Sequence, residues 1–144
     1  MRLQLALNVK NLESAIDYYS IMFDTNPHKI RKGYANFAIE NPALKLVLFE
    51  NPLAEEHLNH IGVELSEPRE VGETSDRFEK AGILGSVQTD NNCCHANQDK
   101  IWTQHRENLN WEWYIIKDDK PDQELDQDVR LCCQNQDDLT SACC

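Results

Sequence analysis

A strand-like pattern of alternating hydrophobic residues occurs twice along this chain, and a helix-like pattern follows each copy. Residues 2–9, "RLQLALNV", and residues 58–65, "LNHIGVEL", place apolar side chains at every second position, which is the period of a β-strand. When the two segments are aligned, Gln4 and His60 occupy equivalent positions on the mixed face. The repeat predicts that the chain is built from two similar modules.

A helix is predicted after each of these strands. Asn11 can cap the first helix. Its apolar stripe consists of Leu12, Ile16, Tyr19 and Phe23. Pro68 fits the first turn of the second helix, which can end at Gly82.

Three short strands are predicted after each helix. In the first half they are "HKIRKG", "YANFAIE" and "KLVLFE", and in the second half "GSVQT", "HANQDKIWTQ" and "NWEWYII". The order strand, helix, three strands therefore occurs twice, which predicts an α+β fold of two βαβββ modules. The apolar face of each first strand is expected to lie under its helix, and the mixed faces are expected to line a shared concave surface.

The chain has a formal net charge of -11, from 14 basic and 25 acidic residues, and no basic stripe that could neutralise phosphates. Nucleic acid is therefore not an expected partner. No apolar run approaches the roughly 20 residues of a membrane span, and the N-terminus does not resemble a signal peptide. We expect no membrane partner and a cytoplasmic location.

The charge is concentrated near the C-terminus. Residues 118–144 contain 8 acidic and 2 basic residues (2 − 8 = −6), whereas residues 1–117 contain 17 and 12 (12 − 17 = −5). The C-terminal segment also lacks sustained apolar periodicity. We predict one domain over residues 1–117 and an acidic, cysteine-containing flexible tail over residues 118–144.

All six cysteines occur as adjacent pairs, namely Cys93 and Cys94, Cys132 and Cys133, and Cys143 and Cys144. A disulfide between neighbours in the chain would be strained, so reduced thiols are the simpler interpretation. Two neighbouring thiolates suit a soft ion such as trivalent arsenic, trivalent antimony or Cd(II). The alternative is that Cys93 and Cys94 are ordinary loop residues, and the tail pairs either capture metalloid or are merely tolerated.

Three polar residues on strands form a candidate metal site. Glu112 and Tyr114 share one face of "NWEWYII", opposite the tryptophans, while Gln4 and His60 lie on the mixed faces of their strands. One imidazole, one carboxylate and one amide oxygen resemble the open ligand set of non-haem Fe(II) oxygenases. The alternatives are a solvated Gln4, a hydrogen-bonded core His60, and a Glu112 paired with a lysine or an arginine.

These segments together resemble the vicinal oxygen chelate superfamily, which includes glyoxalases and extradiol dioxygenases. Within it, the chain is similar to the arsenic–carbon lyases and cadmium-induced proteins. The segments that carry the resemblance are "QLALNV", "GYANFAIENPALKLVLFENP", "LNHIGVEL", "CCHANQDKIW" and "WEWYII". The resemblance implies a vicinal oxygen chelate fold around a metal cavity.

The lyases of that family use non-haem Fe(II) and dioxygen to cleave the carbon–arsenic bond of trivalent organoarsenicals. Methylarsonous acid and trivalent aromatic arsenicals yield arsenite, which gives organoarsenical resistance. The resemblance implies that Gln4, His60 and Glu112 bind Fe(II) and that Cys93 and Cys94 bind the arsenic of the substrate.

One position departs from the family pattern. The residue after the cysteine pair, commonly tyrosine in the family, is His95 here, which can alter the substrate range or add a proton carrier. Tyr114 is expected to position a reactant, because it lies on the same side of its strand as Glu112.

Two other functions compete with the lyase. A resistance protein that binds cadmium or arsenite without turnover would use the thiols equally well, but it would not need an open site of nitrogen and oxygen ligands. A glyoxalase-like isomerase lacks a fourth ligand here and does not explain the thiols. The oligomeric state stays open, because two modules in one chain could complete a site without a dimer.

Overall fold

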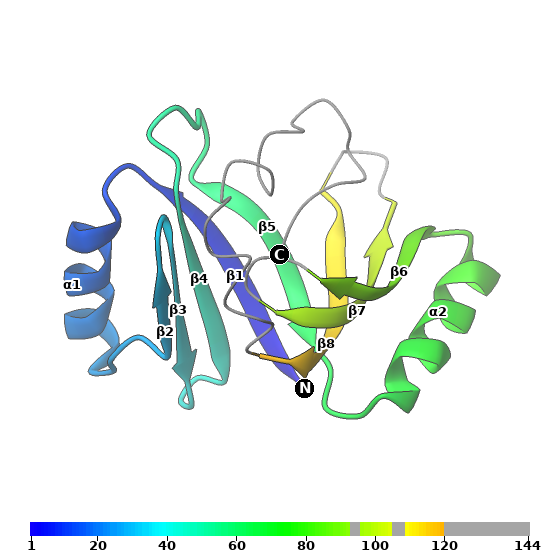
Figure 1. Cartoon of the computed structure of the whole chain (residues 1–144). Helices are drawn as coiled ribbons and strands as arrows, with labels where there is room; N and C mark the ends of the chain where they lie inside the picture. The colour runs from blue at the N-terminus through cyan, green and yellow to red at the C-terminus, as the bar shows by residue number, and fades with distance from the viewer. Residues whose placement is uncertain (93–95, 105–108, 120–144) are drawn as a thin grey trace. The chain divides into compact units, whose positions relative to one another are not determined.

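The computed structural model describes residues 1–92, 96–104 and 109–119, and in these ranges the order strand, helix, three strands occurs twice (Figure 1). The first run consists of β1 (Arg2–Val9), α1 (Leu12–Phe23), β2 (Lys29–Arg31), β3 (Tyr34–Ile39) and β4 (Leu44–Glu50). The second consists of β5 (Leu58–Glu64), α2 (Arg69–Ala81), β6 (Leu84–Asn92), β7 (Asn97–Thr103) and β8 (Trp111–Asp118). The predicted α+β class and element order are confirmed.

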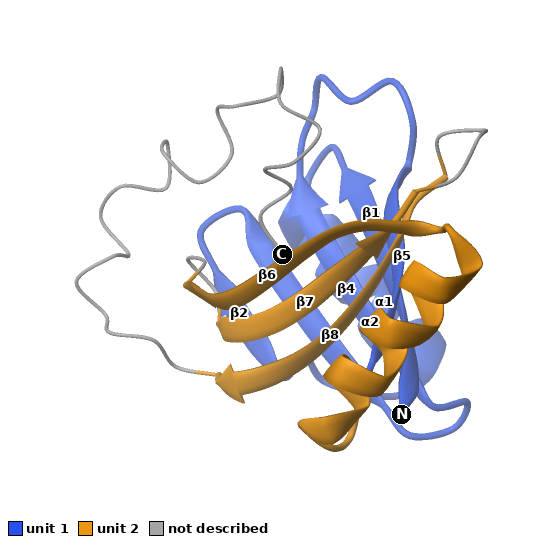
Figure 2. Cartoon of the chain, turned by 90° about the vertical axis from the view of Figure 1, so that its right-hand side faces the viewer, with its two compact units in different colours: residues 1–64 blue, residues 65–144 orange. Residues whose placement is uncertain are grey.

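The chain divides into two compact units, Met1–Glu64 and Leu65–Cys144 (Figure 2). The division falls one strand later than the sequence repeat suggests, because β5 opens the second run yet belongs to the first unit. The reason is its pairing: β5 lies antiparallel to β1, from Arg2 opposite Glu64 to Leu7 opposite Leu58. The side chains of β5 therefore belong to the first unit.

In the first unit, α1 covers one face of the strands. The strand order is β2, β3, β4, β1, β5, and the β1–β4 pair is parallel. The buried core beneath the helix consists of Leu12, Ala35, Phe37, Ile39, Leu46 and Leu48. The predicted helical stripe and the apolar face of β1 pack against this core, so the expected placement of that face under the helix is confirmed.

Both helices begin and end close to the predicted residues. The Asn11 side chain accepts a hydrogen bond from the backbone N–H of Ser14, as a capping asparagine does. The second helix ends at Gly82, whose positive φ of 68° suits glycine. Pro68 precedes the first helical residue rather than lying inside the first turn, a shift of one residue.

In the second unit, β6, β7 and β8 form antiparallel pairs, and α2 packs on one face. The Phe78 and Trp113 rings meet edge to face with centroids 5.5 Å apart. The Arg77 guanidinium lies over both rings, 5.1 Å from Phe78 and 5.3 Å from Trp113. Trp113 therefore faces the helix, which leaves Glu112 and Tyr114 on the opposite face, as predicted.

Strand β6 is longer than the predicted "GSVQT". It continues to Asn92, because Asn91 pairs with Gln98 and Asn92 pairs with Asn97 on the neighbouring strand. Asparagine is a poor strand former, so the composition indicated a loop. Here the partner strand supplies the pairing that the local sequence does not favour.

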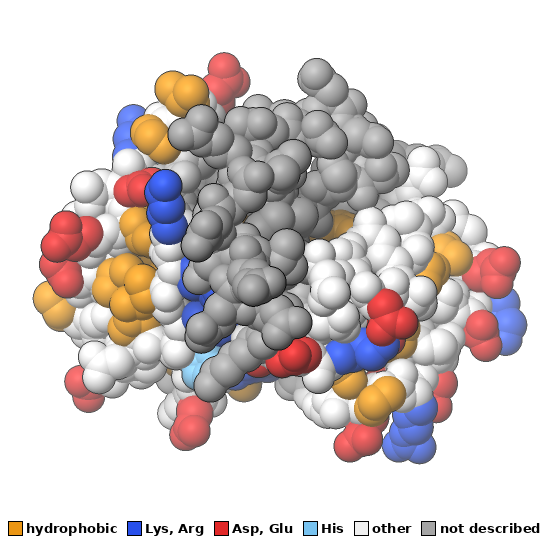
Figure 3. Space-filling model, in the orientation of Figure 1, with side chains coloured by type: hydrophobic (Ala, Val, Ile, Leu, Met, Phe, Trp, Pro, Cys, Tyr) orange, Lys and Arg blue, Asp and Glu red, His pale blue; other side chains and the backbone are white. Residues whose placement is uncertain are grey.

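Exposed apolar side chains gather on the outer face of α1 (Figure 3). They include Tyr18, Ile21 and Met22, whereas the predicted stripe on the other side of the helix packs against the core. Neither helix is long and apolar enough to cross a membrane, and this holds for the described ranges of the chain.

Candidate functional site

Gln4 and His60 meet on the face of the first unit that α1 does not cover. Their Nε2 atoms lie 2.9 Å apart, and both residues are buried, with 3% and 6% of their surfaces exposed. The strand register explains the meeting: Gln4 lies opposite Gly62 and His60 lies opposite Ala6, so the two side chains are diagonal neighbours. The structure thus brings two of the three predicted ligands together.

Hydrogen bonds within the first unit set the orientation of the His60 ring. Its Nδ1 lies 2.8 Å from Asn59 Oδ1, and Asn59 Nδ2 donates to Asn8 Oδ1 at 2.9 Å. Since the bond to Asn8 turns the Asn59 oxygen toward the ring, His60 Nδ1 carries the proton and donates it. In the neutral ring this tautomer leaves the lone pair on Nε2, which is the form that binds a metal ion.

The Gln4–His60 geometry fits two neighbouring ligands of one cation. Two atoms that each lie about 2.1 Å from an ion, at right angles, are about 3 Å apart. The observed separation of 2.9 Å agrees with this value. A half-turn of the Gln4 amide about its last torsion replaces the nitrogen with the oxygen, which is the ligand atom. The pair can therefore offer one nitrogen and one oxygen to a metal such as Fe(II).

Aromatic rings lie beside this pair in the first unit. The Phe49 ring centroid is 6.4 Å from that of His60, and the Tyr34 and Phe49 rings meet at 5.5 Å. Asn36 Nδ2 donates to the Tyr34 hydroxyl at 2.8 Å. The rings give this face an apolar wall beside its polar groups, which is the composition of most small-molecule sites.

Glu112 lies in the second unit and forms a buried ion pair with Lys100. Lys100 Nζ is 3.0 Å from Glu112 Oε1, and the side chains are 0% and 1% exposed. The two opposite charges attract each other directly in these buried surroundings. The alternative that Glu112 pairs with a lysine is therefore realised.

The Lys100 contact leaves Glu112 able to bind a metal ion. A carboxylate offers about four lone pairs, and one ammonium group does not occupy them all. The position of Lys100 follows from the register, since Lys100 lies opposite Tyr114 and Trp102 lies opposite Glu112. Sequence reasoning missed Lys100, because only the pairing of β7 with β8 brings it to Glu112.

Tyr114 is fully buried on the face that also carries Lys100 and Glu112. Its backbone carbonyl accepts a hydrogen bond at 2.8 Å from the N–H of Leu65, the first residue of the second unit. The structure places Tyr114 beside the predicted ligand Glu112, and its contact with a reactant stays a prediction.

The predicted arsenic-binding residues Cys93, Cys94 and His95 lie outside the described residues, and so do the two cysteine pairs of the tail. Among the residues that the structure does describe, no three His, Cys, Asp or Glu side chains gather into a metal-binding group. The predicted iron ligands fall outside this description, because one of them, Gln4, is none of these four residue types.

Comparison with known proteins identifies one matching superfamily profile and several proteins of similar sequence. The sequence profile of the glyoxalase/bleomycin resistance protein/dioxygenase superfamily matches residues 3–99. A trivalent organoarsenical cleaving enzyme of Thermomonospora curvata is 42% identical over 137 residues, which are 94% of this chain and 90% of that protein. A cadmium-induced protein of Mycobacterium tuberculosis is 40% identical over 143 residues, 94% of each chain. A probable trivalent organoarsenical cleaving enzyme of Bacillus subtilis is 31% identical over 96% of this chain and 95% of that protein.

Solved structures agree on the fold. Methylmalonyl-CoA epimerase from Mycobacterium tuberculosis aligns with a TM-score of 0.55 at 15% identity, over 78% of this chain and 85% of that chain. A superfamily member from Vibrio splendidus aligns with a TM-score of 0.53 at 10% identity, over 80% and 97%. At these identities the similarity concerns the fold alone, and it confirms the glyoxalase-like class.

Proposed function

Because this chain belongs to the glyoxalase/bleomycin resistance protein/dioxygenase superfamily, we propose that it is an Fe(II)-dependent dioxygenase-type lyase of trivalent organoarsenicals. It cleaves the carbon–arsenic bond of methylarsonous acid or a trivalent aromatic arsenical and releases arsenite. The observation that carries the proposal is the similarity to the Thermomonospora curvata enzyme, which covers 94% of this chain. The consequence for a cell is resistance to organoarsenicals.

In this proposal Gln4, His60 and Glu112 bind the iron. A bound Fe(II) with open coordination positions supplies the activation of dioxygen. His60 contributes Nε2, the ring nitrogen opposite the one that contacts Asn59, and Gln4 contributes its amide oxygen. Glu112 contributes negative charge that compensates the cation. Lys100, which contacts Glu112 at 3.0 Å, limits the rotation of that carboxylate.

Cys93 and Cys94 bind the arsenic of the substrate. Methylarsonous acid carries two hydroxyl groups on arsenic, and each thiol replaces one of them. In each exchange a sulfur–arsenic bond forms, an arsenic–oxygen bond breaks, and the hydroxyl leaves as water with the thiol proton. Arsenic stays trivalent in this step, so no oxidant is needed. Two bonds then hold the substrate in one orientation, which lowers the entropy cost of the reaction.

Sequestration of cadmium or arsenite without turnover is the second candidate function. The 40% identity to a cadmium-induced protein supports it. The Gln4–His60 pair favours the lyase, because thiols alone suffice for sequestration and do not need a nitrogen and an oxygen ligand 2.9 Å apart.

The two functions differ in what happens to methylarsonous acid in air. Reduced, Fe(II)-loaded protein is incubated with an excess of methylarsonous acid, denatured, and assayed for arsenic species. We expect several arsenite molecules per chain and none when iron is omitted. Recovery of all the methylarsonous acid intact, with up to one equivalent bound to the protein, would instead establish sequestration.

The orientation of His60 gives a further prediction. We expect Asn59→Ala to weaken Fe(II) affinity about 10- to 100-fold, which is the usual effect of losing the hydrogen-bond partner of a ligating histidine. Asn59→Asp keeps an acceptor oxygen and should retain most of the affinity. An anaerobic Fe(II) titration measures both variants.

The matched control for this prediction is Asn51→Ala. Asn51 is another asparagine of the first unit, and its side chain accepts a hydrogen bond from the Leu53 N–H instead of contacting His60. Its loss should leave Fe(II) affinity unchanged. If Asn59→Ala binds Fe(II) as tightly as Asn51→Ala does, Asn59 has no part in orienting the ligand.

A further inference from the structure

Three basic side chains lie on the face of the first unit that α1 does not cover, which is also the face of the candidate ligands. Strand residues on this face alternate with the core residues that pack beneath the helix. By the strand register, the three are Lys29 and Arg31 of β2 and Lys45 of β4. Lys45 lies opposite Gln4 on the adjacent strand, and Gln4 in turn contacts His60. A positive charge is therefore one strand away from the candidate metal ligands.

Positive charge exceeds negative charge on this face. Among the strand residues that the structure describes there, the one carboxylate is that of Glu64, which forms an ion pair with a fourth basic residue, Arg2. Glu50 of β4 points the other way, since its Oε1 accepts a hydrogen bond from the Leu12 N–H of α1. The face is thus locally positive in a chain whose formal net charge is -11.

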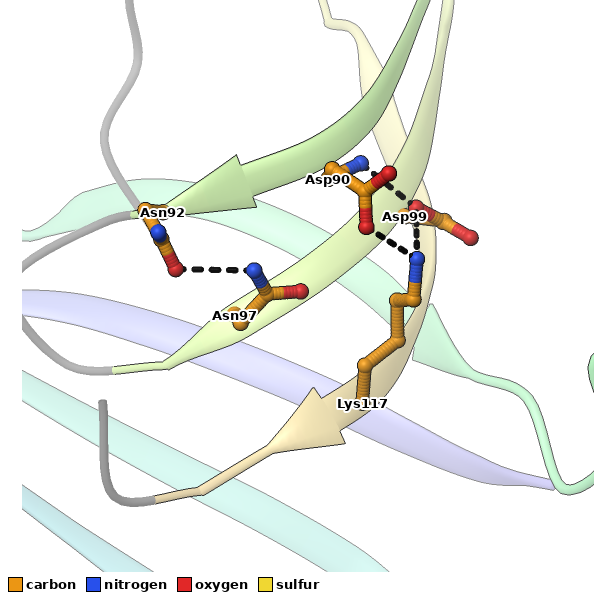
Figure 4. Close-up of polar contacts among 5 residues, drawn as sticks. All are labelled: Asp90, Asn92, Asn97, Asp99 and Lys117. Atoms are coloured by element: carbon orange, nitrogen blue, oxygen red, sulfur yellow. Dashed lines mark hydrogen bonds and ion pairs between the residues drawn. The ribbon is translucent and has the colours of Figure 1, made fainter.

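The charged cluster at the ends of the second unit's strands has the opposite character. Lys117 of β8 forms ion pairs with Asp90 of β6 and Asp99 of β7 (Figure 4). The hydrogen bond to Asp90 raises the pKa of Lys117, so this lysine stays charged throughout the neutral range. Two carboxylates nevertheless outweigh one ammonium group, so an anion binds less favourably at this cluster than on the positive face of the first unit.

Lys45 belongs to the buried part of the positive face. It is 8% exposed, compared with 3% for Gln4 and 6% for His60. Few lysines in proteins are this buried. An ammonium group in such surroundings attracts an anion more strongly than it does in water, because the effective dielectric constant is lower. The location of Lys45 therefore suits direct contact with an anionic group of a bound molecule.

An apolar cluster lies next to Lys45 on the same face. It consists of Ala6, Tyr34, Val47 and Phe49. Val47 is two residues from Lys45 along β4, and Ala6 lies opposite both Val47 and His60. The cluster provides aliphatic and aromatic surface beside the candidate ligands, which suits the ring of an aromatic ligand.

We propose that Lys45 is a specificity-determining residue that binds a negatively charged substituent on the ring of an aromatic arsenical. The inference rests on the proposed function, in which the carbon cleaved from arsenic lies near iron held by Gln4 and His60. The ring attached to that carbon then lies against the apolar cluster. Its substituent faces Lys45, one strand away from Gln4. Among aromatic arsenicals, the preferred substrates are therefore those with an acidic group such as a carboxylate.

The test compares two arsenicals that differ in charge but scarcely in shape. They are 4-carboxyphenylarsonous acid and 4-carbamoylphenylarsonous acid, in which a neutral amide replaces the carboxylate. Equilibrium dialysis against iron-free protein, with arsenic quantified on both sides, gives a Kd for each. Arsenic is attached in the same way in both compounds, so its contribution cancels in the ratio of the two Kd values. The parent is the full chain with serine at the four tail cysteines Cys132, Cys133, Cys143 and Cys144.

We expect the parent to bind the carboxylate about 10-fold more tightly than the amide, as one charge-assisted contact provides. Lys45→Met should bring the ratio of the two Kd values close to one. Lys45→Arg keeps the charge and should restore most of the preference. The net charge of -11 opposes an anionic ligand, so a preference for the carboxylate reports a local contact.

The matched control is Lys32→Met. Lys32 is an exposed lysine in the turn between β2 and β3 of the same unit, and its loss changes the net charge by the same amount. Solvent and salt screen an exposed charge, so the ratio should stay within about twofold of the parent. An equal loss of preference in Lys32→Met, or a Lys45→Met ratio equal to that of the parent, would overturn the inference.

Two further measurements separate specificity from stability. A fold defect lowers the affinity for both compounds equally and leaves their ratio unchanged, whereas the loss of the Lys45 contact changes the ratio. Arg31→Met removes a partly exposed cation of the same face and extends the test if Lys45→Met does not fold. Its ratio should fall about 2- to 5-fold. An unchanged ratio in Arg31→Met would count against anion binding by this face.

The inference and the proposed function fail in different ways. A parent that prefers the carboxylate but releases no arsenite from either compound refutes the lyase and leaves the role of Lys45 intact. A parent that releases arsenite but has a ratio near one refutes the inference alone. A parent that binds neither compound refutes both.

Discussion

Replacement of Lys100 by methionine is expected to lower the free energy of unfolding by about 3–5 kcal/mol. Lys100 and Glu112 are 0% and 1% exposed, and their charged atoms lie 3.0 Å apart. Methionine is close to lysine in length, so packing is largely kept while a buried carboxylate loses its cation. Urea unfolding followed by tryptophan fluorescence measures the change.

Two variants control this result. Lys117→Met removes a lysine whose ion pairs are at the surface, with 41% of its side chain exposed, and should cause only a small loss. Lys100→Met combined with Glu112→Leu removes both buried charges and should recover most of the stability. If Lys100→Met is no less stable than Lys117→Met, the Lys100–Glu112 pair does not compensate a buried charge.

Serine at Cys93 or Cys94 is expected to lower the affinity for methylarsonous acid about 10²- to 10⁴-fold, which is the usual gain from a second linked contact. A hydroxyl group does not replace a thiolate on a soft centre such as trivalent arsenic. The double variant should be little weaker than either single one, because one remaining thiol already loses the two-point attachment.

The measurement is turnover and Fe(II) titration on both single variants and the double variant, with the four tail cysteines replaced by serine. Fe(II) affinity should barely change, because the iron ligands in this account are Gln4, His60 and Glu112. Full turnover in the double variant would remove the thiol pair from the mechanism.

The faces of the strands could be predicted from sequence, whereas their register could not. In β8 the alternation of tryptophan with Glu112 and Tyr114 was enough, because one face packs on α2 through Trp113. The Lys100–Glu112 contact depends on Lys100 lying opposite Tyr114 in the neighbouring strand. Register is set by pairing between strands, and a single strand carries no local signal of it.

The orientation of His60 shows a second limit. Asn59 precedes His60, and strict alternation places neighbouring side chains on opposite faces of a strand. Asn59 Oδ1 nevertheless reaches His60 Nδ1 at 2.8 Å, because the Asn59 amide is held by Asn8 on the adjacent strand. The β1–β5 register also shifts between Ala6 and Leu7. Such local departures follow from the pairing of strands that are distant in sequence.

X-ray absorption at the iron and arsenic edges of one anaerobic sample most directly tests whether arsenic is bound by the thiols while iron is bound by Gln4, His60 and Glu112. The sample is the full chain with serine at the four tail cysteines, loaded with Fe(II) and one equivalent of methylarsonous acid. We expect nitrogen and oxygen neighbours around iron, with no sulfur, and two sulfur neighbours plus carbon around arsenic. Sulfur bound to iron, or arsenic without sulfur neighbours, would contradict this assignment.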